Sequence, residues 1–141
     1  MALSSTDQLL TAAFVSTVND KSWVTVKVQE PWFELIVSGG KTVEGRPGSK
    51  YAYLKGRVNR IILTSGERSA VVTVKDVRLY PDLDSYLATE WRKCVPDAET
   101  IEEARRRYLD IKVDGVAVFG PDGPKMADGV TAIELDDVVL L

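Results

Sequence analysis

The sequence predicts an α+β domain, in the form of a small mixed β-barrel with helices at its periphery. Short segments rich in β-branched and aromatic side chains recur along the 141 residues, and two of them are joined by a turn as tight as Ser65-Gly66-Glu67. Helical patterns interrupt this series after the first and the fourth expected strand. Strands joined directly by hairpins favour a curled, partly closed sheet over a parallel sheet with crossover helices. We expect a single domain, since this length and an apolar content of 45% suffice for one core.

The first segment predicts a helical extension, residues 1–20, in front of a core that spans residues 22–138. Ser5 and Gln8 form a capping box for an amphipathic helix over residues 5–18. The apolar face of this helix is a candidate surface for a protein partner.

The core begins with a predicted strand and a short helix. Residues 23–28 alternate β-forming side chains, as a half-buried strand does. Pro31 suits the first turn of a helix that continues to Val37. Gly39-Gly40 then ends this helix with a left-handed residue, and residues 42–46 are expected to be extended.

The later strands are predicted as two hairpins. Residues 58–64 and 69–79 give the clearest strand patterns and flank the tight turn. Residues 113–119 and 130–135 are expected to pair with each other around Pro121-Asp122-Gly123.

Two helices are predicted between these hairpins. One begins at Pro81-Asp82 and ends near Cys94, before a proline that breaks it. The other begins at a second capping box, Thr100 and Glu103, and runs to about Tyr108.

The composition excludes several kinds of site. The chain has no histidine, which removes the usual general base and the commonest metal ligand. Its one cysteine, Cys94, excludes an internal disulfide and a multi-cysteine metal site, and we expect this thiol in the core. We therefore expect no metal and no cofactor. No apolar run approaches the ~20 residues of a membrane span, and no secretory or transit pattern begins the chain, so we expect a cytoplasmic protein away from membranes.

The charges are segregated along the chain. Residues 41–78 carry a net charge of +6 in a chain whose total is −3. A basic middle between acidic segments favours one positive face and a polyanionic ligand. The alternative interpretation is a solvated β-meander in which Lys and Arg protect the strand edges.

One short run of charged residues is the strongest candidate for a site. Residues 39–46 read Gly-Gly-Lys-Thr-Val-Glu-Gly-Arg. Glu44 and Arg46 are two positions apart on an expected strand and so share a face, and Lys41 is expected to emerge from the turn at the mouth of the fold and to converge with them. Such a trio can hold a phosphate or a base edge, can supply a lysine base of lowered pKa, or can be a salt-bridge cluster that only fixes the strand.

The stretch from Gln29 to Arg46 resembles the ASCH domain family. The likeness is in the Pro31-Trp32 start of the helix, its glycine stop and the G-x-K-x-x-E-x-R run that follows. The likeness extends over residues 24–135. The resemblance implies a barrel of the PUA type that handles RNA or modified nucleosides.

Two enzymatic branches of that family are relevant. One hydrolyses acetylated cytidine with a lysine, a threonine and a glutamate. Lys41 matches its lysine, but Glu44 stands where its threonine would be, and its glutamate would lie somewhere from Glu90 to Asp97. Another branch cleaves single-stranded RNA and has a lysine that also matches Lys41.

The resemblance and the basic segment together predict that RNA or a modified nucleoside binds in a cleft lined by Lys41, Glu44 and Arg46. Further candidate contacts to nucleic acid are aromatic or basic: Trp32, Lys50, Tyr51, Tyr53, Lys55, Arg57 and Arg60. Trp32 on a short helix is also a natural core residue. A second hypothesis is a hydrolase of acylated pyrimidine nucleosides or of single-stranded RNA, with Lys41 as base and Glu44 as proton carrier. A third is a protein-interaction module in transcription or RNA processing.

Overall fold

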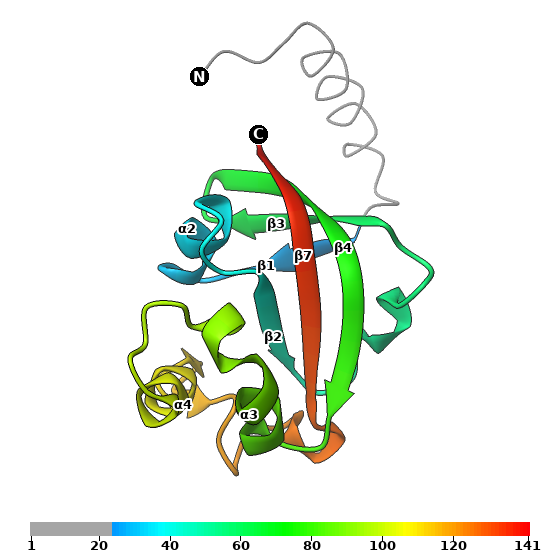
Figure 1. Ribbon diagram of the computed structural model, residues 1–141. Helices are drawn as coiled ribbons and strands as arrows, with labels where there is room; N and C mark the ends of the chain where they lie inside the picture. Colours follow the sequence, from blue (N-terminus) through cyan, green and yellow to red (C-terminus); the bar gives the residue numbers. More distant parts are fainter. Residues whose placement is uncertain (1–23) are drawn as a thin grey trace, which may run out of the picture.

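A computed structural model describes residues 24–141 and shows a strongly curled five-stranded sheet with helices against one side and one end (Figure 1). The helix expected over residues 5–18 lies outside the described residues. The strands are β1 (Thr25–Lys27), β2 (Val43–Pro47), β3 (Arg60–Ser65), β4 (Arg68–Tyr80) and β7 (Val130–Leu140). Their order in the sheet is β1-β3-β4-β7-β2. The predicted α+β class is confirmed, as a half-barrel built around the long, bent strands β4 and β7.

The sheet is mixed. β3 and β4 form the predicted hairpin through Gly66, whose φ of +58° lies in the left-handed region that glycine tolerates. β1 pairs with β3 in parallel, whereas β7 pairs antiparallel with both β4 and β2. Register shifts between Val71 and Thr73 and between Val74 and Asp76 mark irregular pairing in the bent part of β4.

Three helices begin and end close to the predicted positions. They are α2 (Trp32–Val37), α3 (Leu83–Cys94) and α4 (Ile101–Leu109). The Asp82 side chain caps α3 by accepting a hydrogen bond of 2.7 Å from the backbone N–H of Ser85. Thr100 caps α4 in the same way, but the Glu103 carboxylate accepts from the backbone N–H of Glu99 and not from that of Thr100. Two short 3₁₀ turns, η1 (Ala52–Leu54) and η2 (Met126–Asp128), complete these elements.

The prediction that residues 113–119 and 130–135 pair as a hairpin is wrong. The strands β5 (Lys112–Val113) and β6 (Val116–Ala117) pair only with each other, while β7 lies in the main sheet between β4 and β2. The β5–β6 turn is Asp114-Gly115, with φ of +52° and +80°, which is the dipeptide that favours the tightest hairpin loops. β7 is buried at five of its first six positions, and such a strand needs neighbours on both edges.

The core between the sheet and the helices is rich in aromatic side chains. Tyr86, Tyr108 and Phe119 pack edge to face, with ring centroids 5.5 Å and 4.8 Å apart. Cys94 is buried here as a free thiol, in agreement with the prediction. This packing fixes the carboxyl end of α3 against the start of β2, where the charged run lies.

Candidate functional site

A cleft of about 600 Å³ opens between β2, the end of β1 and the β5–β6 hairpin. We call it the base cleft. Most of its wall is apolar, and β1 and β2 supply three of its six polar side chains. It is lined by Lys27, Gln29, Trp32, Glu44, Arg46, Pro47, Ile111, Val113, Asp114, Val116, Val118, Phe119, Pro124 and Lys125.

The three charged residues of the motif converge, as the sequence predicts. Glu44 is in the middle: its Oε1 lies 3.4 Å from Lys41 Nζ and its Oε2 lies 3.3 Å from Arg46 Nη1. Glu44 and Arg46 both reach the base cleft because alternate residues of β2 point to the same side. A carboxylate therefore faces the cleft with one cation on each side of it.

Lys41 does not lie at the mouth of the fold, and that expectation is wrong. Its side chain is buried, and Nζ donates hydrogen bonds to the carbonyls of Val43 (2.6 Å) and Cys94 (2.8 Å). The turn at Gly39 directs the chain inward, and the last carbonyls of α3 attract a cation. With Glu44 these acceptors can engage all three N–H groups of the ammonium. Lys41 thus lies behind Glu44 and is not part of the cleft wall.

Arg46 lies at the boundary between the base cleft and a second hollow, which is described below. Its Nη1 donates to the carbonyl of Lys27 at 2.9 Å, and its guanidinium lies 5.9 Å from the centre of the Tyr51 ring. Its Nε is buried and has no hydrogen-bond partner among the described residues. A buried N–H without an acceptor is unusual in a folded protein, so the described residues use only part of the hydrogen-bonding capacity of Arg46.

The second hollow, of about 300 Å³, is next to the base cleft, and we call it the basic shelf. Lys27, Arg46, Pro47 and Lys125 line both hollows, so the two adjoin each other. The remaining residues of the shelf are Thr25, Lys50 and Tyr51. Lys50 Nζ lies 5.4 Å from the centre of the Tyr51 ring, a cation–π distance.

Comparison with known proteins agrees with this architecture. The ASCH domain family model matches residues 26–117. The chain belongs to the ASCH domain family. In the crystal structure of hypothetical protein PH0355, the similar chain is 27% identical with a TM-score of 0.60, and the match covers 81% of this chain and 96% of that one. The solution structure of protein PF0455 from Pyrococcus furiosus is 25% identical with a TM-score of 0.51, covering 81% and 94%. No curated protein matches the sequence.

Only some of the other predicted contacts of this ASCH domain lie near the cleft. Trp32 is 7% exposed and packs against Tyr108, with the Arg107 guanidinium 4.7 Å from its ring centre, so it is mainly a core residue with one edge on the base cleft. Lys50 and Tyr51 line the basic shelf. Four further candidates line neither hollow and lie on or beside η1 and β3: Tyr53, Lys55, Arg57 and Arg60.

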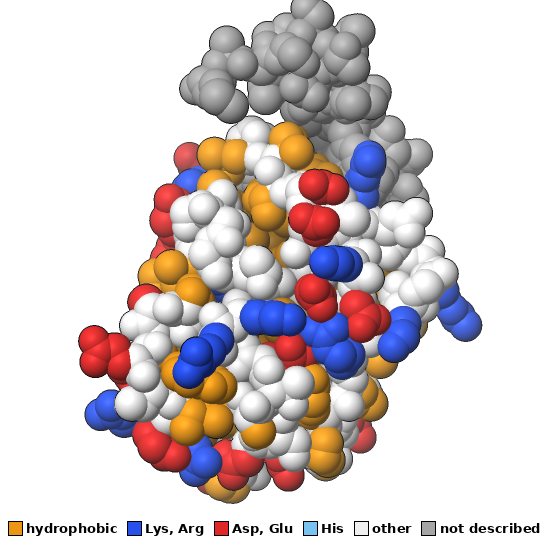
Figure 2. All heavy atoms as spheres, in the orientation of Figure 1, with side chains coloured by type: hydrophobic (Ala, Val, Ile, Leu, Met, Phe, Trp, Pro, Cys, Tyr) orange, Lys and Arg blue, Asp and Glu red, His pale blue; other side chains and the backbone are white. Residues whose placement is uncertain are grey.

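The basic segment of the ASCH domain does not form one positive face. Figure 2 shows acidic and basic side chains intermixed over β4 and β7. Lys55 pairs with Asp76 at 3.5 Å, Lys75 with Glu134 at 3.8 Å, and Arg68 with Glu34 at 2.8 Å. These cations are largely compensated locally, so the sequence count of +6 overstates the positive potential of the segment.

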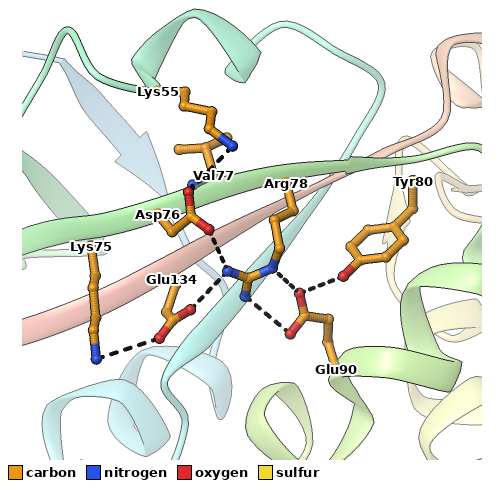
Figure 3. Close-up of polar contacts among 8 residues, drawn as sticks. All are labelled: Lys55, Lys75, Asp76, Val77, Arg78, Tyr80, Glu90 and Glu134. Atoms are coloured by element: carbon orange, nitrogen blue, oxygen red, sulfur yellow. Dashed lines mark hydrogen bonds and ion pairs between the residues drawn. The ribbon is translucent and has the colours of Figure 1, made fainter.

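Arg78 is the centre of this charge network (Figure 3). It binds both oxygens of Glu90, at 2.7 Å and 3.1 Å, and also contacts Asp76 and Glu134. Hydrogen bonds to Glu90 are the main cause that raises the pKa of the Arg78 guanidinium above its ordinary value. Burial and a hydrogen bond to Glu90 raise the pKa of Tyr80. Glu90 is therefore engaged by Arg78 and Tyr80, and it has no ion pair with Lys41 among the described residues.

Several residues of the cleft and the shelf were missed by the sequence analysis. Lys27 had a usable signal, because it is the last residue of β1 and lies between the buried Val26 and Val28, so its side chain must point outward. Lys125 and Phe119 had no such signal in the sequence, because their place in the site depends on how the loop between β6 and β7 folds back against β2. Among the described residues, no group of His, Cys, Asp and Glu is arranged to hold a metal ion, and no helix is long and apolar enough to cross a membrane.

Proposed function

We propose that this ASCH domain binds RNA or a modified nucleoside, with one nucleobase held in the base cleft. The observation that carries the proposal is a mostly apolar cleft of about 600 Å³ with Glu44 and Arg46 in its wall. That volume lies within the ~300–1,000 Å³ typical of small-molecule sites, which combine apolar walls with a few fixed polar groups.

The apolar part of the cleft suits the flat face of a base. Val113 and Val116 on the β5–β6 hairpin are 51% and 39% exposed, and both line the cleft. Phe119 and Val118 lie in the same wall. A base that covers these side chains removes apolar surface from water, which favours binding by roughly 25 cal/mol for each Å².

The polar part suits the edge of a base. The Glu44 carboxylate accepts hydrogen bonds and cannot donate them when ionised, so it selects an amine or ring N–H. Arg46 offers the opposite chemistry, because its guanidinium carries only donors and its side chain lines the same cleft. Side by side, the two select a base edge that carries a donor next to an acceptor.

Lys41 supports binding over hydrolysis. Its side chain is buried behind Glu44 and donates to two carbonyls, so its donors are engaged by the protein and it holds Glu44 in place. A general base needs to reach the substrate, and Lys41 does not line the cleft.

Calorimetric titration of the whole chain with the four ribonucleosides, N4-acetylcytidine and a ten-nucleotide single-stranded RNA tests the proposal. Glu44→Gln should weaken binding by about 10- to 100-fold, as expected for a hydrogen bond to a charged group. Glu134→Gln is the matched control, because Glu134 also lies between two cations, Lys75 and Arg78, but outside the cleft. Absence of binding to every probe, or an equal loss in both variants, would contradict the proposal.

A further inference from the structure

We propose that the basic shelf is a phosphate subsite, which holds a phosphate attached to the nucleoside whose base occupies the base cleft. This inference rests on the proposed function and narrows the ligand to a nucleotide unit, so that a bare nucleoside leaves half of the site empty. The expected natural form is a phosphodiester within a single strand.

The charge of the shelf is the first argument. Four of its lining side chains are cationic, Lys27, Arg46, Lys50 and Lys125, and none is a carboxylate. This concentration stands out in a chain of net charge −3. Arg46 is paired with Glu44, but the three lysines have no carboxylate partner within the described residues. Cations gathered in this way repel one another, and an anion bound among them removes that repulsion.

The pairing of the cations is the second argument. Within the described residues, Lys27, Lys50 and Lys125 form no ion pair, whereas Lys55 and Lys75 each have a carboxylate partner. The cations that pair with carboxylates lie mainly away from the two hollows. Lys93 and Lys112 also form no ion pair within the described residues, but they line neither hollow, whereas Lys27, Lys50 and Lys125 meet at the shelf. The shelf therefore has free ammonium groups for a phosphate, while the network around Arg78 does not.

The position of the basic shelf next to the base cleft is the third argument. Lys27, Arg46 and Lys125 line both hollows, so a ligand can reach from one into the other past a shared wall. A base and its own phosphate are joined by a single ribose, which suits two adjoining hollows. Arg46 contacts Glu44 on the cleft side and lies over Tyr51 on the shelf side, so one guanidinium can serve both parts of the nucleotide.

Tyr51 restricts the positions of two cations at the shelf. Its ring is half-buried, and both Lys50 and Arg46 lie within cation–π distance of it, at 5.4 Å and 5.9 Å. These contacts restrict the two cations before any ligand arrives, which lowers the entropy lost on binding.

The test compares two triple variants that remove the same charge. The shelf variant is Lys27→Gln with Lys50→Gln and Lys125→Gln. The control variant is Lys55→Gln with Lys75→Gln and Lys93→Gln, three exposed lysines that line neither hollow. Affinity for a fluorescein-labelled ten-nucleotide single-stranded RNA is measured by anisotropy over a series of salt concentrations, after circular dichroism melting has established that each protein is folded.

The shelf variant should bind this RNA at least about tenfold more weakly than the control variant, because charge-assisted bonds to phosphate are among the strongest hydrogen bonds. The plot of log K against log salt should also become less steep by about 0.7 for each phosphate that the variant no longer neutralises. Equal losses and equal slopes in the two triple variants would overturn the proposal. If the triple shelf variant does not fold, the three single shelf variants are measured in its place. Each should lose more affinity for the RNA than the corresponding single control variant.

A second arm separates this inference from the proposed function. Each ribonucleoside is compared with its 5′- and 3′-monophosphates: tighter binding of a monophosphate, abolished in the shelf variant, supports a phosphate subsite. Nucleoside binding that depends on Glu44 but gains nothing from a phosphate would overturn the subsite and leave the base cleft standing. RNA binding that depends on the shelf lysines but not on Glu44 would overturn both the base cleft and its link to the shelf.

Discussion

The Lys41 ammonium and the Glu44 carboxylate form an ion pair of 3.4 Å in which the two side chains are 0% and 8% exposed. Only Glu44 faces the base cleft, and Lys41 supports it from behind. Because Lys41 is buried and does not line the cleft, we expect that its loss lowers the free energy of unfolding.

Lys41→Met should destabilise the fold by about 3–5 kcal/mol, because removing one partner leaves a buried carboxylate with less compensation. The carbonyls of Val43 and Cys94 also lose their donor. Urea unfolding followed by tryptophan fluorescence measures the change. Adding Glu44→Gln to Lys41→Met should recover part of the loss, since the uncompensated charge is then absent. A decrease below about 1 kcal/mol for Lys41→Met would contradict this role.

Arg78→Met should cost about 3–5 kcal/mol for a similar reason, because among the residues drawn in Figure 3 it leaves the buried Glu90 with the Tyr80 hydroxyl as its remaining donor. Arg68→Met is the matched control: its pair with Glu34 is equally short, 2.8 Å, but the side chains are 43% and 58% exposed. Exposed pairs contribute ~0–1 kcal/mol. Equal urea midpoints for the two variants would show that burial does not set the strength of the Arg78 network.

Gly45→Ala should destabilise the protein by about 1–3 kcal/mol through overpacking. A Cβ atom at Gly45 would lie 2.5 Å from the Tyr86 hydroxyl oxygen, and the Tyr86 ring is fully buried beside Tyr108 and cannot move aside easily. Gly40→Ala is the control, because its Cβ would have its nearest neighbour at 3.7 Å and its φ is not in the left-handed region. Thermal melting of both variants should show a clear loss for Gly45→Ala only.

The local parts of this fold could be predicted from the sequence. The caps at Asp82 and Thr100 and the turn at Gly66 act over a few residues, so their signals lie within one short window. The convergence of Glu44 and Arg46 follows from the two-residue period of a strand.

The predictions that were wrong concern features that depend on contacts between residues far apart in the sequence. The buried Lys41 donates a hydrogen bond to the carbonyl of Cys94, 53 residues later, and no neighbouring residue signals this. The pairing of β7 with β2 likewise joins segments at opposite ends of the core. The basic shelf combines Lys27 with Lys125, and a count of charges along the chain cannot separate such free lysines from those, like Lys75, that have a partner.

Alkaline pH should unfold this protein through two buried phenols. The Tyr86 and Tyr108 hydroxyls lie 2.6 Å apart, and burial raises the pKa of both well above the ordinary value. The unfolded chain releases these protons near pH ~10 while the folded chain retains them. Their contribution to stability is therefore complete below about pH 10 and decreases as pH rises, by about 1.4 kcal/mol per pH unit for each phenol. Burial also raises the pKa of Cys94, which adds a loss in the same direction from about pH 8.5 upward.

The double variant Tyr86→Phe with Tyr108→Phe isolates this effect. Replacing both partners of one hydrogen bond by apolar groups of the same shape is close to neutral at pH 7. Free energies of unfolding from urea titrations between about pH 7 and pH 11 should fall steeply above about pH 10 in the wild type and much less in the double variant. Parallel curves for the two proteins would mean that other groups control the alkaline limit. Tyr51→Phe serves as the control, because Tyr51 is only half-buried on the shelf, and it should keep the wild-type curve.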